Sequence, residues 1–254
     1  MSDALLEARG IVRRFGHVEA LRGADFTAYP GEIVGLIGDN GAGKSTLVKI
    51  LSGADQPTSG QILIEGSPVA LDSPQAARDQ GIETVYQDLA LAADLDPPAN
   101  LFLGREILRR GLWGKLGFLD KKAMNREAAE AIVRLGVTLK DGAAAVADLS
   151  GGQRQSVAVA RAAMWARKVI FMDEPTAALG AVQQRMVLDL VRRVRDQGIT
   201  VVLISHNMQQ VLEVCDRVEV LRLGTRVAQL GTSGTTVEDL VAAMTAGTIK
   251  ERQQ

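Results

Sequence analysis

A glycine-rich loop, Gly38 to Thr46, limits the possible folds of this chain more than any other feature. It reads Gly-Asp-Asn-Gly-Ala-Gly-Lys-Ser-Thr and follows an apolar run, Ile33 to Ile37, that is typical of a buried strand. A helical stretch, Lys44 to Ser52, overlaps its end. The glycines let consecutive backbone N–H groups curl around a phosphate, and the positive N-terminus of the helix points at it. The loop therefore predicts an α/β domain that binds a nucleoside triphosphate.

The polar side chains of this loop are expected to share the contacts to the nucleotide. Lys44 bridges the β- and γ-phosphate oxygens in this interpretation, and Ser45 offers a hydroxyl to Mg²⁺, a hard ion that prefers oxygen ligands. Thr46 supports the α-phosphate. The predicted nucleotide-binding residues of the loop are Gly38, Asn40, Gly41, Ala42, Gly43, Lys44, Ser45 and Thr46.

Two carboxylates follow a second apolar run. Val169 to Met172 leads directly into Asp173 and Glu174, at the carboxyl end of a predicted parallel strand, where such sheets bind ligands. Asp173 is expected to hold the Mg²⁺ shell. Glu174 points the other way along the pleat and is expected to polarise the attacking water as the general base. The alternative is a solvated helix start before Pro175, but the complete phosphate loop in the same chain favours a catalytic role.

Two further polar residues follow other strand-like runs. His206 comes after Thr200 to Ser205, so its imidazole is expected at the same sheet edge, where it contacts the γ-phosphate and holds the water in place. Gln87 comes after Ile82 to Tyr86, and its neutral amide is expected to touch the metal shell and to move with the helical stretch that follows. The predicted catalytic residues are Glu174, His206 and Lys44, and the predicted metal ligands are Ser45, Gln87 and Asp173.

A second glycine-rich cradle lies far along the chain, in the sequence Leu149 to Gln153. Ser150, Gly151, Gly152 and Gln153 open an amphipathic helix that runs to about Trp165. A capping hydroxyl, two glycines that expose the backbone and a helix dipole therefore meet at one anion-binding point. One nucleotide needs only one such cradle. The second cradle is expected to serve the nucleotide of a second subunit.

Strand-like and helical runs alternate along most of the chain. This alternation predicts a mainly parallel sheet covered by helices. Two pairs of strands are expected outside it, one within Leu5 to Tyr29 and one within Arg217 to Leu230, and they predict a flanking antiparallel layer. We expect a single domain over residues 1–254, with a helical subdomain inserted at residues 88–166.

The predicted insertion has its own internal signals. Pro97-Pro98 is expected to break the chain before a short helix at Ala99 to Leu103. Asp120 is expected to cap an alanine-rich helix over Lys121 to Leu135. The segment Arg109 to Leu119 is expected to be a loop that packs on this subdomain and has no site of its own.

The composition narrows the cellular context. The chain has 29 basic and 30 acidic residues and a net charge of −1, which gives no indication of a broad surface for nucleic acid. Its one cysteine, Cys215, indicates a reducing compartment and is expected to be a small buried residue on a helix. Met1 to Arg9 has early acids and no long apolar core, so it does not resemble a signal peptide. The apolar runs are too short to cross a bilayer.

The motifs of this chain resemble, in their order along it, the motif set of ABC-transporter nucleotide-binding domains. The matching residues are Phe15, Gly38 to Thr46, Gln87, Leu149 to Gln153, Asp173-Glu174 and His206. The resemblance covers nearly the whole chain. It implies an ATPase that uses ATP and Mg²⁺, in a head-to-tail dimer. Each ATP is then sandwiched between the phosphate loop of one subunit and the Ser150 region of the other, and Phe15 stacks on adenine.

A narrower resemblance rests on two stretches, Ile82 to Leu91 and Ala99 to Glu106. They are similar to the ATPases of bacterial importers for simple sugars of the ribose, xylose and fructose kind, and this chain has one ATPase unit, as the fructose type does. This resemblance implies a membrane permease and a sugar-binding protein as partners. It also implies a peripheral location on the cytoplasmic face of the membrane, with a permease loop that docks near Gln87 to Gly104.

One stretch departs from the family pattern. After Asp173-Glu174-Pro175-Thr176 the family usually has Ser-x-Leu-Asp, whereas this chain has Ala177-Ala178-Leu179-Gly180. The aspartate that reaches across subunits is missing, as it is in similar sugar-importer ATPases. The departure concerns the coupling between the two nucleotide sites, and it removes no phosphate or metal ligand.

Two other functions are compatible with the motifs. A soluble ABC ATPase of DNA repair or translation would have the same nucleotide site, but those proteins typically need long coiled coils or tandem domains, and this chain has neither. A module that closes on ATP and hardly hydrolyses it would account for Gly180, but the presence of Glu174 and His206 argues against it.

Overall fold

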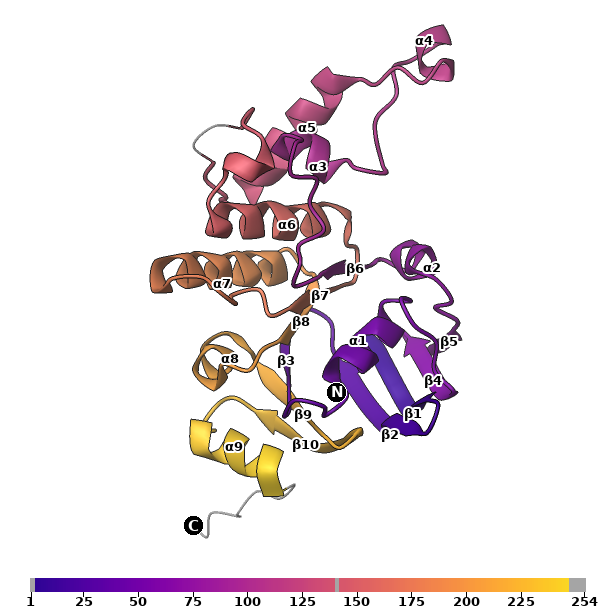
Figure 1. The fold of residues 1–254 in the computed structure, drawn as a ribbon, viewed down its shortest axis with the longest axis vertical. Helices are drawn as coiled ribbons and strands as arrows, with labels where there is room; N and C mark the ends of the chain where they lie inside the picture. Colours follow the sequence, from indigo (N-terminus) through magenta and orange to yellow (C-terminus); the bar gives the residue numbers. More distant parts are fainter. Residues whose placement is uncertain (1–2, 140–141, 247–254) are drawn as a thin grey trace. The chain divides into compact units, whose positions relative to one another are not determined.

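A computed structural model describes residues 3–139 and 142–246 of the chain (Figure 1). The chain forms two compact units. The first contains the residues up to Gln87, Ala166–Pro175 and the residues from Val194 onward. The second contains Asp88–Trp165 and Thr176–Arg193. The sequence-based boundary of 88–166 did not include residues 176–193, which belong to the second unit by their contacts.

The larger sheet of the first unit carries the phosphate loop. Its strand order is β10-β9-β3-β8-β7-β6, and all neighbours are parallel except β10 and β9. Strands β3 and β8 are buried along their whole length, as central parallel strands are, which explains their continuous apolar sequences. The strands are β3 Ile33–Ile37, β6 Ile82–Val85, β7 Val169–Asp173, β8 Thr200–Ile204, β9 Arg217–Arg222 and β10 Thr225–Gly231.

A smaller antiparallel sheet completes the β-structure of the first unit. Its order is β2-β1-β4-β5. The strands are β1 Leu6–Phe15, β2 Val18–Ala28, β4 Ser59–Ile64 and β5 Ser67–Val69. The predicted mainly parallel sheet with an antiparallel flank is confirmed. The sequence did not indicate β4 and β5, and the late pair β9 and β10 extends the parallel sheet instead of joining the flank.

Within residues 3–139 and 142–246, the helices that belong entirely to the first unit are α1 Lys44–Leu51, α2 Pro74–Asp79, α8 Met208–Val214 and α9 Val237–Ala246. In Figure 1, α1 lies beside β1 and β2, and its apolar side chains join those of both sheets in one buried cluster. Cys215 is buried as expected, but it lies directly after α8 and not on a helix. Burial raises the pKa of its thiol. No helix in the described part of the chain is both long and apolar enough to span a membrane.

The second unit is helical. Its elements are α3 Pro97–Leu101, α4 Leu112–Lys115, α5 Lys121–Arg134, η1 Val146–Asp148, α6 Gly151–Trp165 and most of α7 Ala181–Asp196. Asp120 caps α5 by accepting a hydrogen bond from the Ala123 N–H, as predicted. The expectation for Pro97-Pro98 was wrong. Both prolines lie inside the first turn of α3, where their missing N–H groups cost nothing, and Asp96 caps that turn.

A buried asparagine fixes the segment before α3. Asn100 is 0% exposed. Its side-chain carbonyl accepts from the Ala92 N–H at 2.8 Å, and its amide nitrogen lies 3.0 to 3.2 Å from the carbonyl oxygens of Ala92, Leu95 and Asp96. One side chain thus supplies the acceptor for the Ala92 N–H and a second donor for carbonyls that already accept a backbone hydrogen bond.

We expect Asn100→Ala to lower the free energy of unfolding by about 2 kcal/mol, because it removes the acceptor of the Ala92 N–H and the side-chain donor of three carbonyls. Chemical denaturation followed by circular dichroism measures the change. Asn125→Ala, at an exposed position on α5, is the matched control and is expected to be neutral within about 0.5 kcal/mol. Equal effects of the two substitutions would contradict this role of Asn100.

Candidate functional site

The phosphate loop between β3 and α1 keeps its shape because two of its glycines have no room for a side chain. A Cβ on Gly38 would lie 2.2 Å from the carbonyl oxygen of Leu221, and one on Gly43 would lie 2.6 Å from the Leu21 side chain. Both residues also have positive φ, 153° and 102°. Gly41 has φ of 80° and open space around it. The loop is therefore fixed from behind by the sheets and open in front.

Lys44, the first residue of α1, folds back over the loop. Its Nζ donates to the carbonyl oxygens of Gly38 at 2.6 Å and Asp39 at 3.1 Å. Burial lowers its pKa, and the charges of Glu174, Asp173 and Asp39 oppose that shift. The ammonium group of Lys44 is thus partly removed from water, and its partners are two uncharged carbonyl oxygens. An anion bound in the loop would stabilise its charge more than these carbonyls do.

An open hollow of about 560 Å³ lies in front of the loop. Its floor is the loop itself, and Val18 and Leu223 contribute apolar walls. Such a hollow, with backbone N–H groups and a lysine at its base, has the features of a triphosphate site. The residues that line it are Val18, Glu19, Ala20, Arg22, Asp39, Asn40, Gly41, Ala42, Gly43, Lys44, Ser45, Thr46 and Leu223.

Phe15 ends β1 and pairs with Val18, one of the residues that line the hollow. The Phe15 side chain is 48% exposed, although it is large and apolar. The guanidinium of Arg13 lies 4.5 Å from the centre of its ring, and two hydrogen bonds to Asp55, at 2.6 and 3.0 Å, hold that guanidinium in place. Phe15 is therefore supported by Arg13 and remains accessible.

The two carboxylates predicted from the sequence lie at the carboxyl end of β7. Asp173 is the register partner of Ile204 on β8, the strand that lies between β7 and β3. Burial raises the pKa of Asp173, the neighbouring Glu174 raises it further, and Lys44 and Lys49 oppose the shift. Asp173 is thus a carboxylate that a cation would stabilise.

Glu174 is joined to His206 across this edge. Its Oε1 lies 2.7 Å from Nδ1 of His206, which follows β8, and its backbone N–H donates to the carbonyl of Ile204 at 3.0 Å. Glu174 has φ of 49°, in the left-handed region that residues other than glycine seldom adopt. The structure therefore brings the predicted base and the predicted histidine together, with the histidine ring mostly exposed.

The remaining predicted metal ligands are less constrained. Ser45 is exposed in the first turn of α1. Gln87 is exposed two residues beyond the end of β6 and is the last residue before the second unit begins. Among the described residues, no group of three or more His, Cys, Asp or Glu side chains could hold a metal ion. A metal at this edge would have to rely on hydroxyl, amide and nucleotide oxygens besides Asp173.

The second cradle, in the helical unit, is a reciprocal cap. The Ser150 hydroxyl accepts from the Gln153 N–H at 3.3 Å, and the Gln153 side-chain oxygen accepts from the Ser150 N–H at 3.0 Å. This is the capping-box arrangement at the start of α6. The sequence led us to expect the hydroxyl as a cap, but not the return bond from Gln153.

Gln183 is a neighbour of this cradle that the sequence did not predict. A Cβ on Gly152 would lie 2.9 Å from the Gln183 side chain, and the oxygen of that side chain accepts from the Gly180 N–H at 2.9 Å. Gln183 thus links the glycines of the cradle to the segment that departs from the family pattern. The only signal in the sequence was the lack of a side chain at Gly152, which does not identify the residue that fills the space.

A mainly parallel sheet that carries this loop at the carboxyl end of a strand defines a nucleoside triphosphate-binding protein. The model of the ABC transporter family matches residues 21–177. The chain belongs to the ABC transporter family and is an ATPase of that family.

The similar curated proteins carry more specific names. The fructose import ATP-binding protein of Rhizobium meliloti is 51% identical over 245 residues, which are 96% of this chain and 94% of that protein. The xylose/arabinose import ATP-binding protein of Sulfolobus acidocaldarius is 46% identical and is matched over 95% of its length. A ribose import ATP-binding protein of Rubrobacter xylanophilus is 44% identical over 98% of this chain, but the match spans only 48% of that protein.

Solved structures support the fold. A nucleotide-free ATP-binding cassette from an ABC transporter matches with a TM-score of 0.78 and 25% identity, over 90% of this chain and 92% of that one. The ADP conformation of another ATP-binding cassette matches with a TM-score of 0.78 and 24% identity, over 96% of this chain and 95% of that one. Both sheets and the helical unit thus belong to a known architecture.

Proposed function

We propose that this chain is the motor subunit of an importer for a monosaccharide. The observation that carries the chemical part of the proposal is the Glu174–His206 pair beside the phosphate loop. Its relatives are named as import ATP-binding proteins for fructose, for xylose or arabinose, and for ribose, and these names support a monosaccharide as the cargo. Hydrolysis in such a protein drives a membrane partner through cycles of closure and opening.

The phosphate loop binds ATP in this proposal. Lys44 moves its ammonium from the carbonyl oxygens of Gly38 and Asp39 to the β- and γ-phosphates, which restores full charge pairing to a half-buried cation. Phe15 stacks on the adenine with one face while Arg13 supports its ring. Thr46 and the backbone from Gly38 to Ser45 hold the remaining phosphate oxygens.

The residues at the sheet edge fit a magnesium ion that enters with the nucleotide. Ser45, Asp173 and Gln87 supply the hydroxyl, carboxylate and amide oxygens that such an ion prefers. Burial, and then the charge of Glu174, raise the pKa of Asp173, and a cation beside it would favour its ionised form. When bound, the ion would neutralise charge on the phosphates. Glu174 accepts a proton from the attacking water, and His206 orients that carboxylate and contacts the γ-phosphate.

A second copy of the chain completes the site. Ser150, Gly151, Gly152 and Gln153 form an anion cradle on the helical unit, and we propose that it receives the γ-phosphate of the partner's ATP. Two nucleotides then close a head-to-tail dimer, and hydrolysis reopens it. The integral-membrane permease docks near Gln87 to Gly104, so the protein acts as a peripheral subunit at the cytoplasmic face, and the sugar-binding protein reaches it only through the permease.

Co-purification from native membranes tests the import proposal. The tagged chain is recovered after gentle solubilisation with ATP present, and its partners are identified by mass spectrometry. A polytopic permease together with a sugar-binding protein is the expected result. Ribosomal or DNA-associated proteins without a membrane partner would overturn import and leave the ATPase chemistry intact.

The proposed role of Asp173 predicts that one substitution raises the stability of the nucleotide-free protein and lowers its stabilisation by ATP with Mg²⁺. We expect Asp173→Asn to raise the stability of the nucleotide-free protein, because it removes a carboxylate that is costly to bury and repelled by Glu174. It should also reduce the extra stability that Mg²⁺ adds to ATP binding. Thermal denaturation with and without ATP and Mg²⁺ measures both effects.

The gain in nucleotide-free stability has a defined pH dependence. Because the pKa of Asp173 is raised in the folded state, its protonated form is favoured there, and wild-type stability is lost as the pH rises through that pKa. The difference between wild type and Asp173→Asn should therefore shrink toward acid pH. Asp72→Asn, at an exposed position of the same unit, should show neither effect. A nucleotide-free protein that is less stable after Asp173→Asn would refute the argument.

A further inference from the structure

The segment that the sequence indicated as an ordinary packed loop is an exposed arm. We use the word arm for Leu108–Leu119. A bridge between Leu108 and Leu119 closes its base, where the Arg109 N–H donates to the Phe118 carbonyl at 2.9 Å and the Asp120 N–H to the Ile107 carbonyl at 2.7 Å. In Figure 1 the arm reaches away from α3 and α5 and carries α4 at its tip.

The base of the arm packs on the helical unit, and the tip of the arm is held by contacts within itself. Ile107 and Leu119 pack against the buried cluster of the helical unit. Within the tip, the rings of Trp113 and Phe118 meet edge to face at 5.2 Å. Gly114 has no space for a side chain, since a Cβ there would overlap the carbonyl oxygen of Arg109. The arm is thus a closed, internally packed element and not an extended linker.

The tip presents large apolar side chains to solvent. Leu112 is 71% exposed, Trp113 58% and Leu116 62%. These residues lie on and directly after a single short helix, with only Gly114 and Lys115 between Trp113 and Leu116. Exposed apolar surface of this kind marks a place where a protein meets another surface.

The arm also carries a concentrated positive charge. Its charged residues are Arg109, Arg110 and Lys115, with no acid among them, whereas the whole chain has a net charge of −1. The rest of the chain therefore carries a net charge of −4. The basic residues of the arm stand out against an acidic remainder, which indicates a negatively charged partner surface.

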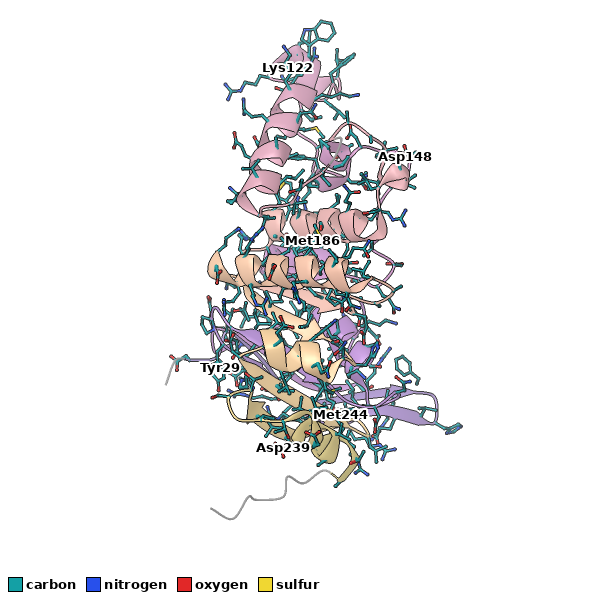
Figure 2. The ribbon with its side chains drawn as sticks, turned by 90° about the vertical axis from the view of Figure 1, so that its left-hand side faces the viewer. Tyr29, Lys122, Asp148, Met186, Asp239 and Met244 are labelled. Atoms are coloured by element: carbon teal, nitrogen blue, oxygen red, sulfur yellow. The ribbon has the colours of Figure 1, made fainter. Side chains whose placement is uncertain are left out.

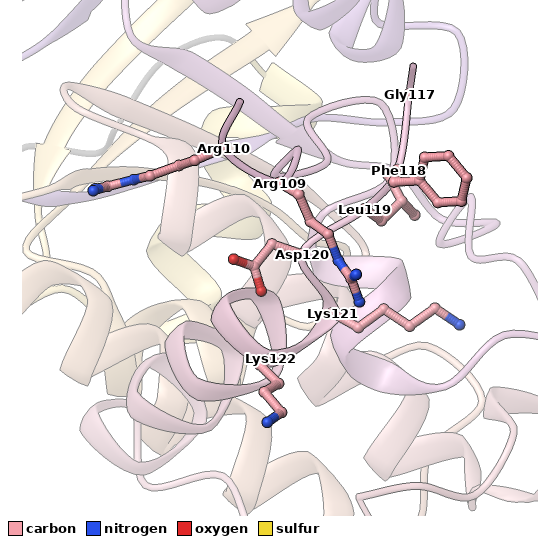
Figure 3. Close-up of a pocket in the computed structure, with 8 residues that line it drawn as sticks. All are labelled: Arg109, Arg110, Gly117, Phe118, Leu119, Asp120, Lys121 and Lys122. Atoms are coloured by element: carbon pink, nitrogen blue, oxygen red, sulfur yellow. The ribbon is translucent and has the colours of Figure 1, made fainter. Parts of the chain in front are cut away.

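A hollow of about 750 Å³ lies at the base of the arm, between its start and the first turn of α5. Four basic side chains line it, those of Arg109, Arg110, Lys121 and Lys122, and Figure 3 shows them around the carboxylate of Asp120. Figure 2 shows Lys122 at this end of α5. Asp120 caps α5, and none of the four basic side chains forms an ion pair with another described residue.

We propose that the arm docks on an anionic phospholipid surface. The phosphate groups of the lipids lie in the hollow among the arginines and lysines, and Leu112, Trp113 and Leu116 enter the boundary between headgroups and acyl chains. Tryptophan and long basic side chains are the residues that suit this boundary, and a basic patch beside a short apolar tip gives two signals for one membrane. The inference does not depend on the proposed import function, since the chain alone should bind lipid.

Vesicle flotation with the purified full chain tests the proposal. We expect binding to vesicles of phosphatidylglycerol and phosphatidylcholine, little binding to phosphatidylcholine alone, and weaker binding at high salt. The double variant Arg110→Gln, Lys122→Gln should weaken partitioning onto anionic vesicles by roughly fivefold for each of the two charges removed. Trp113→Ser with Leu116→Ser should weaken it by at least about tenfold.

The matched control is Val133→Ser with Arg134→Gln, which removes one exposed apolar and one exposed basic side chain from the far end of α5. It should leave vesicle binding unchanged. Tryptophan fluorescence gives a direct readout, since the chain has two tryptophans and only Trp113 lies on the arm. Trp165 lies in the helical unit, where its indole N–H donates to the Leu101 carbonyl. In a Trp165→Phe variant, the remaining emission of Trp113 should shift to the blue on anionic vesicles only.

Three results would overturn the proposal. Equal binding to neutral and anionic vesicles would remove the role of the basic hollow. Displacement from vesicles by millimolar inorganic phosphate, at constant ionic strength, would indicate a site for a soluble anion. Arm variants that bind vesicles normally but lose a membrane partner in co-purification would assign the arm to a protein contact. ATPase activity of the same variants, measured without lipid, should equal that of the wild type and separates this failure from failure of the nucleotide site.

Discussion

Glu174→Gln should abolish steady-state ATP hydrolysis and leave ATP binding intact. The amide has the shape of the carboxylate and keeps a hydrogen-bonding oxygen for His206, but it cannot take a proton from water. The phosphate loop, which makes the binding contacts in our proposal, is unchanged. Loss of the base should raise the barrier by on the order of 3 kcal/mol or more, which is over a hundredfold in rate.

Phosphate release measures the turnover of this variant, and a fluorescent ATP analogue measures its binding. Glu238→Gln, in the exposed first turn of α9, removes the same charge away from the site and should hydrolyse ATP at the wild-type rate. Near-normal turnover of Glu174→Gln would show that another group activates the water, and the assignment of Glu174 as base would be wrong.

Lys44→Ala should weaken ATP binding by at least about a hundredfold, because hydrogen bonds from a charged donor to phosphate oxygens are each worth about 1.5–3 kcal/mol. The nucleotide-free protein should keep its stability. Burial lowers the pKa of Lys44, so its charge is costly in the empty site, and its present partners are two backbone carbonyls of the loop.

Thermal denaturation distinguishes these two effects. The wild type should gain stability as ATP is added, whereas Lys44→Ala should not. Lys49→Ala is the matched control, since Lys49 is exposed in the last turn of the same helix. A Lys44→Ala protein that still gained the full stabilisation by ATP would show that the phosphate loop is wrongly assigned.

The parts of the fold that could be predicted are those with a strong local pattern. The strands β3, β7 and β8 are short continuous apolar runs, and the loop after β3 has a spacing that few other structures require. Parallel neighbours bring the ends of such strands to one edge, so the meeting of Glu174 with His206 followed from their positions after β7 and β8.

The remaining features depend on contacts between distant residues. The strands β4 and β5 are short and partly exposed, and their register is set by β1. Gln183 became part of the cradle only because α7 packs against Gly152. The basic hollow needs Arg109 and Lys122 to line one cavity, which the closed base of the arm produces and no spacing in the sequence reveals.

The capping box at Ser150 has a consequence for how firmly two subunits could hold one another. Its hydroxyl and the N–H of Gln153 are already paired within one chain. The Ser150 O–H can donate to a phosphate of another subunit while its oxygen still accepts from Gln153. The Gln153 N–H can reach that phosphate only by giving up Ser150, so it contributes to association only the difference between its two bonds. We infer that this limited gain from the Gln153 N–H keeps the association between the subunits weak. A subunit that must separate from its partner after every turnover needs a contact of this kind, in which the hydrogen-bonding groups have partners in the open state as well as in the closed state.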